Sequence, residues 1–207
     1  MRNRFLYLIL AFGLFTACIN MNDPKQQAEY IKCYNSFDTS LVNLMPKKIP
    51  NNFLNMGYAS LDFLDGRGFN KYAGMHIKTK IKDLNEYSEL KNIYSSQARS
   101  INKSIDSCLI IVSTYGQFED NVQGSFYCNK PIPVPQYGIC EANDSTNLWE
   151  RLKDIEIIVL DYEFKDLLNR PDSKKRKDMP TGLSTGYSKG ITLSKNNMTI
   201  QKWVIVW

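Results

Sequence analysis

The sequence has little of what most metal and redox centres require. Its 207 residues include one histidine, His76, which excludes a histidine-rich metal site. Its five cysteines form no Cys-x-x-Cys pair, so neither a thioredoxin-like redox centre nor a zinc knuckle is indicated. No cofactor-binding motif is present either, and we therefore expect no metal and no cofactor.

The sequence also lacks a strong charge of one sign. Its formal net charge is +5, and this falls by two if Arg2 and Arg4 are removed with an N-terminal signal. Such a small excess argues against a nucleic-acid partner. A hydrophobic content of 43% with 12% aromatic residues is typical of a folded domain, and we expect one globular domain over residues 25–207.

Long apolar runs are missing after the N-terminus. The run from Phe5 to Phe15 is shorter than the about 20 residues that a membrane-spanning helix needs. With Arg2 and Arg4 before it and the small Ala17 after it, the segment 1–17 is typical of a cleaved secretory signal.

The residues Phe15-Thr16-Ala17-Cys18 resemble the lipobox of bacterial lipoproteins. The resemblance implies that Cys18 becomes the acylated N-terminus, carrying chains such as palmitate, and that residues 18–24 form a short tether. Two or more chains give a stable anchor in a membrane. Ile19 after the cysteine implies delivery to the outer membrane of a Gram-negative bacterium, and the sparse acidic residues that follow favour its periplasmic face.

The remaining cysteines are even in number, as expected for two disulfides in an exported chain. We favour a bond between Cys128 and Cys140, which would close the proline-rich loop 130–135, a segment expected to be extended. Cys33 and Cys108 lie on expected core faces and are either paired or buried free thiols.

Two helices are expected in the N-terminal half. An apolar stripe from Tyr30 to Leu44 predicts one helix that begins at Pro24 and ends before Pro46. Asp83 and Glu86 resemble a capping box that opens a second helix, whose stripe runs from Leu84 to Ala98.

Strands dominate the rest of the chain. Strict alternation over 75–82 predicts a half-buried strand at the edge of a sheet, and the segments 105–114 and 155–162 read as buried strands. Residues 190–194 and 198–207 form an expected hairpin whose apolar last strand should be central in the sheet. This pattern predicts an α+β fold with a mainly antiparallel sheet, two principal helices in the N-terminal half and a C-terminal β-hairpin.

Two segments match the sequence patterns of serine enzymes without the further residues or motifs that accompany these patterns in such enzymes. Gly186-Tyr187-Ser188-Lys189-Gly190 matches G-x-S-x-G, but no acid or histidine follows it, so an α/β-hydrolase is excluded. A catalytic Ser188 with His76 as base and Asp106, Glu119 or Asp120 as orienting acid stays open. Ser100-Ile101-Asn102-Lys103 matches S-x-x-K at the expected end of a helix, and its partner motifs are absent.

Two groups of cations are candidate sites for an anion or a protein partner. His76 with Lys78, Lys80 and Lys82 would line one face of a strand, where lysines also serve to discourage edge pairing. The other group is a compact basic run that consists of Lys174, Lys175, Arg176 and Lys177. This run either contacts anionic headgroups or forms a solvated loop.

Acidic and aromatic residues offer weaker candidates. The pairs Glu119-Asp120 and Asp161/Glu163 are the acid clusters that a cell-wall hydrolase would need, since glycoside cleavage requires two carboxylates across a cleft. Aromatic residues would line a groove or fill the core, and the core is favoured for Tyr127, Tyr137, Trp149, Trp203 and Trp207.

The sequence therefore favours a non-enzymatic binding protein of the envelope, with an inhibitor or immunity protein as one form of it and an envelope protein or glycan as partner. A serine hydrolase using Ser188 and a carboxylate-dependent cell-wall hydrolase remain the alternatives.

Overall fold

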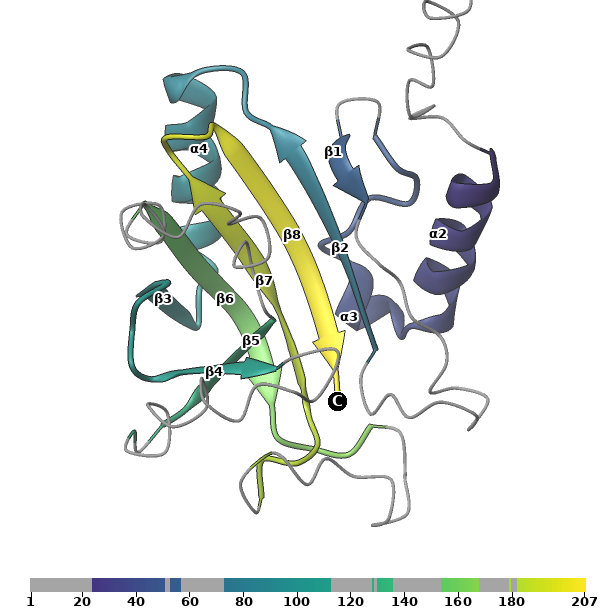
Figure 1. Cartoon of the computed structure of the whole chain (residues 1–207), viewed down its shortest axis with the longest axis vertical. Coiled ribbons are helices and arrows are strands. Elements are labelled where there is room, and N and C mark those ends of the chain that lie inside the picture. The colour runs from purple at the N-terminus through teal and green to yellow at the C-terminus, as the bar shows by residue number, and fades with distance from the viewer. Residues whose placement is uncertain are drawn as a thin grey trace, which may run out of the picture.

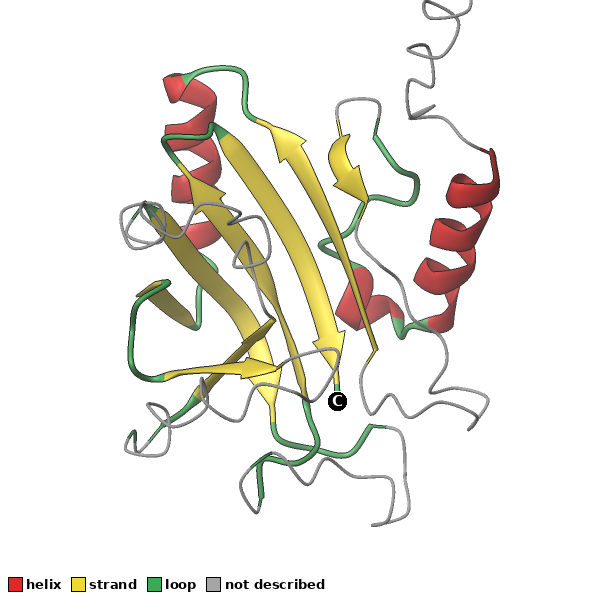
Figure 2. Ribbon diagram, in the orientation of Figure 1, coloured by secondary structure: helices red, strands yellow, loops and turns green. Residues whose placement is uncertain are grey.

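A six-stranded antiparallel sheet forms the centre of the computed structural model, which describes residues 24–50, 53–56, 73–112, 128, 130–135, 154–167, 179 and 182–207. The strand order is β1-β2-β8-β7-β6-β3, and a separate parallel pair, β4–β5, completes the fold (Figures 1 and 2). The predicted α+β class, the mainly antiparallel sheet and the C-terminal hairpin are confirmed. The strands are β1 (Phe53–Met56), β2 (Ala73–Lys80), β3 (Ser100–Lys103), β4 (Leu109–Val112), β5 (Ile132–Pro135), β6 (Ile155–Glu163), β7 (Tyr187–Ser194) and β8 (Thr199–Val206).

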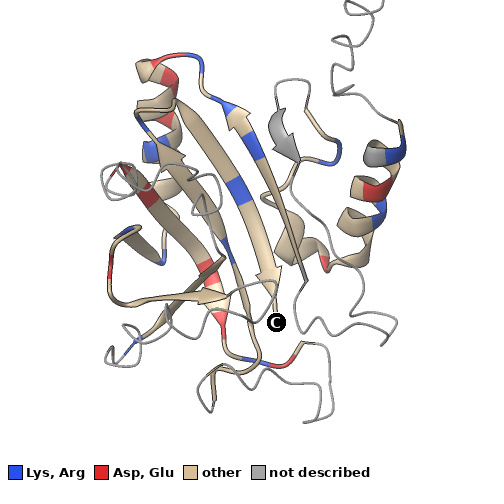
Figure 3. Cartoon of the chain, viewed as in Figure 1, with Lys and Arg blue, Asp and Glu red and all other residues tan. Residues whose placement is uncertain are grey.

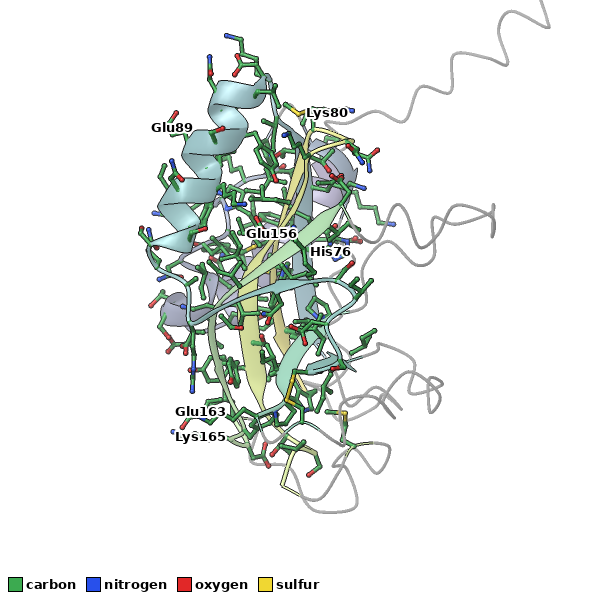
Figure 4. The ribbon with its side chains drawn as sticks, turned by 90° about the vertical axis from the view of Figure 1, so that its left-hand side faces the viewer. His76, Lys80, Glu89, Glu156, Glu163 and Lys165 are labelled. Atoms are coloured by element: carbon green, nitrogen blue, oxygen red, sulfur yellow. A yellow bond between two sulfur atoms is a disulfide. The ribbon has the colours of Figure 1, made fainter. Side chains whose placement is uncertain are left out.

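The two faces of the sheet carry different layers. The helices α2 (Pro24–Ser36), α3 (Thr39–Val42) and α4 (Leu84–Ser95) pack on one face, and the β4–β5 pair packs on the other. The side view of Figure 4 shows α4 and the β4–β5 pair on opposite sides of the long strands. The side chains of β8 alternate between these layers, since Val204 belongs to the helical side and Trp203 to the β4–β5 side.

The last strand is central, as predicted. β8 pairs along its whole length with β2 on one side and with β7 on the other. Trp203 and Trp207 are both 0% exposed and belong to the core, which confirms that part of the aromatic prediction.

The first expected helix is broken into two. α2 ends at Ser36, and Asp38 caps the short α3 by accepting hydrogen bonds from the backbone N–H and hydroxyl of Ser40 at 2.8 and 2.6 Å. The apolar stripe continues across the break because Phe37 and Leu41 still face the core, so periodicity alone did not reveal it. Capping residues compete with helix interiors for backbone donors, which explains why Asp38 ends one helix and begins another.

The capping box of α4 is confirmed in a shifted form. The Asp83 carboxylate accepts from the backbone N–H groups of Asn85 and Glu86 at 3.0 and 2.9 Å. The Glu86 carboxylate accepts in return from the backbone N–H of Lys82, one residue before the cap. The helix ends at Ser95, and Ser100–Lys103 forms β3, so the S-x-x-K residues lie on a strand and not at the expected end of a helix.

The strand predicted over 105–114 begins later than expected. Asp106 accepts from the backbone N–H of Cys108 at 2.8 Å and donates its own N–H to Lys103 O at 2.9 Å. These bonds form a turn that leaves Ile105 47% exposed. The strand therefore starts at Leu109.

The proline-rich segment is a paired strand, and this corrects both its expected loop character and the favoured disulfide. β5 runs parallel to β4, and the structure bonds Cys128 to Cys108, not to Cys140, with a Cα–Cα distance of 5.2 Å. Parallel pairing brings the starts of two strands to the same end, where these two cysteines lie. Cys33 is a buried free thiol, and burial raises its pKa to about 11.

Several predicted features lie outside the described residues. These are the signal 1–17, the tether, the lipidation site Cys18, and Cys140, Lys174, Lys175, Arg176, Lys177, Glu119, Asp120, Tyr127, Tyr137 and Trp149. Within the described ranges, no helix has the length and apolar character needed to cross a membrane.

Candidate functional site

A hollow of about 520 Å³ opens on the helical side of the sheet, at the ends of β6 and β7. The break between α2 and α3 forms one wall, and the end of β6 forms the other. Two predicted carboxylates, Asp161 and Glu163, both line it. The lining residues are Ser36, Phe37, Asp38, Ser40, Leu41, Asp161, Glu163, Lys165, Leu167, Tyr187, Lys189 and Val206.

A second hollow of about 460 Å³ continues from the first toward the end of α4. Asp161 and Lys189 line both hollows, so they mark the place where the two meet. We call the two hollows together the Asp161 groove. The other residues of the second hollow are Asn43, Leu44, Ile93, Tyr94, Gln97, Leu160 and Lys202.

Lys189 forms a bridge across the middle of the groove. Its ammonium group donates to Ser40 O at 2.6 Å and to Asn43 Oδ1 at 3.3 Å. The side chain thereby ties β7 to the end of α3. An ammonium group has three N–H donors, so these two bonds leave one for a further acceptor.

Asp161 is held in place by two neighbours. The Tyr187 hydroxyl donates to Asp161 Oδ2 at 2.8 Å, and Arg99 donates to Asp161 Oδ1 at 3.4 Å. The Arg99 guanidinium also donates to the Tyr162 carbonyl and lies 4.1 Å from the centre of the Tyr162 ring. Burial, followed by the bond to Asp161, raises the pKa of Tyr187 to about 12, so its hydroxyl remains a donor at neutral pH.

The rim of the first hollow carries three further charges. Hydrogen bonds from Ser40 lower the pKa of Asp38, which keeps it ionised. Glu163 and Lys165 are exposed at the end of the molecule opposite Lys80 (Figure 4). Among the described residues, neither the Glu163 carboxylate nor the Lys165 ammonium group has an ion-pair or hydrogen-bond partner within the usual distance limits.

Charge changes sign along the groove. The first hollow is lined by three carboxylates and two ammonium groups, whereas the second is lined by one carboxylate, that of Asp161, and two ammonium groups. Figure 3 shows the acidic bands at the end of β6 beside basic bands on β7 and β8. The groove is thus slightly acidic at one end and slightly basic at the other.

Sequence reasoning found Asp161 and Glu163 but missed the residues opposite them. Asp38 could have been found as a helix-capping residue. Tyr187 and Lys189 lie within the G-x-S-x-G match, a motif that points to the serine and not to its neighbours. Because strand side chains alternate, these two point to the opposite face from Ser188.

The structure does not bring Ser188 and His76 together. Ser188 is 0% exposed, and its hydroxyl donates to Pro133 O at 2.7 Å. His76 lies on β2, which is separated from β7 by the whole of β8. Asp106, one of the proposed orienting acids, is an exposed turn residue bonded to Cys108.

The cationic strand face also differs from expectation. β2 is not an edge strand, because β1 pairs with its outer side. Burial, assisted by the charge of Lys78, lowers the pKa of His76 to about 4, so this histidine is neutral at pH 7. Lys80 donates to Asn197 O at 3.4 Å, and Lys82 follows the strand beyond the buried Ile81. His76 therefore adds no positive charge to this face of β2 at pH 7, whereas Lys78 and Lys80 share the face and Lys82 lies beyond the end of the strand.

No cluster of three or more histidine, cysteine or acidic side chains suited to a metal ion occurs among the described residues. Comparison with known proteins gives no relative: no family model matches the chain, and no match was found among curated proteins or solved structures.

Proposed function

We propose that this chain is a lipid-anchored binding protein of the bacterial envelope and that the Asp161 groove receives a segment of a partner protein. The groove carries the proposal, because apolar and charged side chains from α3, α4, β6, β7 and β8 converge on it. Binding sites for other proteins combine apolar anchors with a polar rim in this way. An inhibitor or immunity role, in which the chain captures another envelope protein, is consistent with a tethered binder.

Hydrolytic functions have less support. Ser188 is buried and serves as a hydrogen-bond donor between strands. A carboxylate-dependent hydrolase needs two carboxylates that are free to act on the bond to be cleaved. Both carboxylate oxygens of Asp161 are already engaged, one by the Tyr187 hydroxyl and the other by Arg99.

The location rests on the N-terminal residues. Arg2, Arg4, the apolar run 5–15 and the pair Ala17-Cys18 support export and acylation of Cys18. Ile19 supports the outer membrane, with the periplasmic face favoured. Cys18→Ser should abolish incorporation of labelled palmitate and release the protein from washed membranes. A Cys18→Ser protein that stays in the membrane fraction would show that another feature anchors the chain.

A photo-crosslinking residue placed inside the groove tests the binding site directly. At Gln97 or Ser36 it should give a discrete adduct in intact cells, whereas at Glu89, on the outer face of α4, it should not (Figure 4). Ile93→Asp and Leu167→Asp, which place a charge on the apolar groove walls, should each remove the adduct.

Absence of adducts at both groove positions, with abundant and anchored protein, would refute the protein-binding proposal. The proposal would also be refuted if the chain co-sediments with purified peptidoglycan and the same two aspartate variants do not. That result would assign the groove to glycan.

A further inference from the structure

We propose that the occupant of the Asp161 groove is an extended polypeptide segment with a basic side chain beside Glu163, an acidic side chain beside Lys202 and an apolar side chain at either end. This inference rests on the proposed function and specifies the chemistry of the partner. Three features of the groove carry it.

The first feature is an exposed apolar side chain in each hollow. Leu167 is 37% exposed in the first hollow, and Ile93 is 44% exposed in the second. An apolar side chain that lines a hollow can receive an apolar anchor of a partner, and such buried anchors supply much of the binding energy at protein interfaces. Because the two lie in separate hollows, a single compact ligand group does not cover both, and a chain with two apolar anchors does.

The second feature is the reversal of charge. Glu163 has no ion-pair partner among the described residues. Lys202 lies 5.8 Å from the Tyr94 ring and likewise has no carboxylate within 4.0 Å in the described part of the chain. A bound segment with a basic residue at one end and an acidic residue at the other would pair with both, and such complementarity fixes the direction of binding.

The third feature is the bridge between the hollows. Lys189 donates two of its three N–H groups to Ser40 O and Asn43 Oδ1, and it lines both hollows. The remaining donor is available at the point that a bound chain must cross. A backbone carbonyl is the acceptor that a polypeptide offers at every residue. An extended conformation, at about 3.3 Å per residue, lets a short segment reach both hollows.

Selection of phage-displayed random dodecapeptides on the full lipidated chain in detergent micelles tests this inference. Wild type should enrich peptides with one basic and one acidic residue between two apolar residues. A synthetic peptide of the enriched sequence should bind E163K/K202E at least about tenfold more weakly than wild type. The same peptide with its two charged residues exchanged should prefer the charge-reversed variant.

The matched control is E89K/K195E, which makes the same two charge changes at exposed positions outside the groove and should bind like wild type. Enriched peptides that bind wild type and E163K/K202E equally would overturn the inference and leave the groove as a protein-binding site. Failure to enrich any peptide that Leu167→Asp weakens would overturn the proposed function and the inference with it.

Discussion

At the scale of single residues, alternate positions of the pentapeptide 186–190 face opposite sides of the sheet. Gly186, Ser188 and Gly190 face the β4–β5 layer, where a Cβ atom on Gly190 would lie 2.7 Å from the Trp203 ring. The intervening Tyr187 and Lys189 face the groove. The glycines of the G-x-S-x-G match are therefore explained by the two tryptophans they accommodate, Trp207 and Trp203.

Gly190→Ala should be strongly destabilising. The new methyl group would overlap the Trp203 ring and the Ile158 carbonyl, and neither backbone nor a fully buried indole can move aside without cost. We expect the free energy of unfolding to fall by about 2–3 kcal/mol, measured by urea denaturation.

Gly182→Ala is the matched control, because nothing lies within 4 Å of its Cβ position. Its φ of +85° alone should cost about 1 kcal/mol. Equal losses for the two variants would contradict the crowding at Gly190.

His76 should make stability depend on pH. The pKa of His76 is about 4 in the folded chain and near 6.5 when unfolded, because burial and then Lys78 disfavour its charged form. Between these values the unfolded chain binds the additional proton, so the free energy of unfolding falls as pH is lowered through this window. The loss due to His76 should reach up to about 3 kcal/mol at pH 4 relative to pH 7.5.

His76→Gln separates this effect from the titration of the carboxylates. Urea denaturation of both proteins at pH 7.5, 5.5 and 4 should show a smaller loss in the variant. If the two curves of stability against pH run parallel, His76 is not buried as the structure places it.

At the scale of elements, the β4–β5 pair shows how a sequence of alternating prolines can still form a strand. Ile132 donates its N–H to Cys108 O at 2.9 Å, so the odd-numbered prolines 133 and 135 direct their missing N–H away from β4. The Pro133 carbonyl, also directed away, accepts from Ser188. The proline content of this segment predicted only an extended conformation. Its pairing with β4 was not predictable, because the partner strand lies more than twenty residues earlier in the sequence.

The disulfide should stabilise this pair of strands. Cys108 and Cys128 are 20 residues apart, and a loop of that length corresponds to about 3 kcal/mol in the chain-entropy model. Cys108→Ser should lower the free energy of unfolding by about this amount. Adding a reducing agent to this variant should cause no further loss that involves Cys128, because Cys128 has already lost its partner. Peptide mapping without reduction should recover the 108–128 pair, and recovery of a 128–140 pair would contradict it.

At the scale of the whole molecule, the sequence predicted the structural features that depend on residues close together in the chain. The amphipathic helices, the cap at Asp83, β6 and the central C-terminal strand follow from periodicity, capping and apolar runs. The helix break at Asp38 and the turn at Asp106 were missed because a short polar side chain outweighed an apolar pattern that continues around it.

The groove was only half predictable for a different reason. Asp161 and Glu163 are close in sequence, but Asp38 and Lys189 reach them from positions more than twenty residues away in either direction. Only the order β8-β7-β6, with α3 packed above it, brings these side chains together. A single sequence carries no signal for such long-range placement, whereas it does carry the local pattern of each strand.

The position of β8 makes the end of the chain essential for folding. Deleting residues 203–207 would remove two tryptophans that are 0% exposed and would leave long stretches of β2 and β7 without a partner. Burial of about 150–250 Å² per tryptophan corresponds to about 4–6 kcal/mol each, which together approaches the whole stability of a typical domain. The unpaired strands would also promote aggregation. The truncated chain should therefore appear in the insoluble fraction, while the complete chain expressed in parallel stays folded in detergent. A soluble truncation with a cooperative thermal transition would show that β8 does not hold the sheet together.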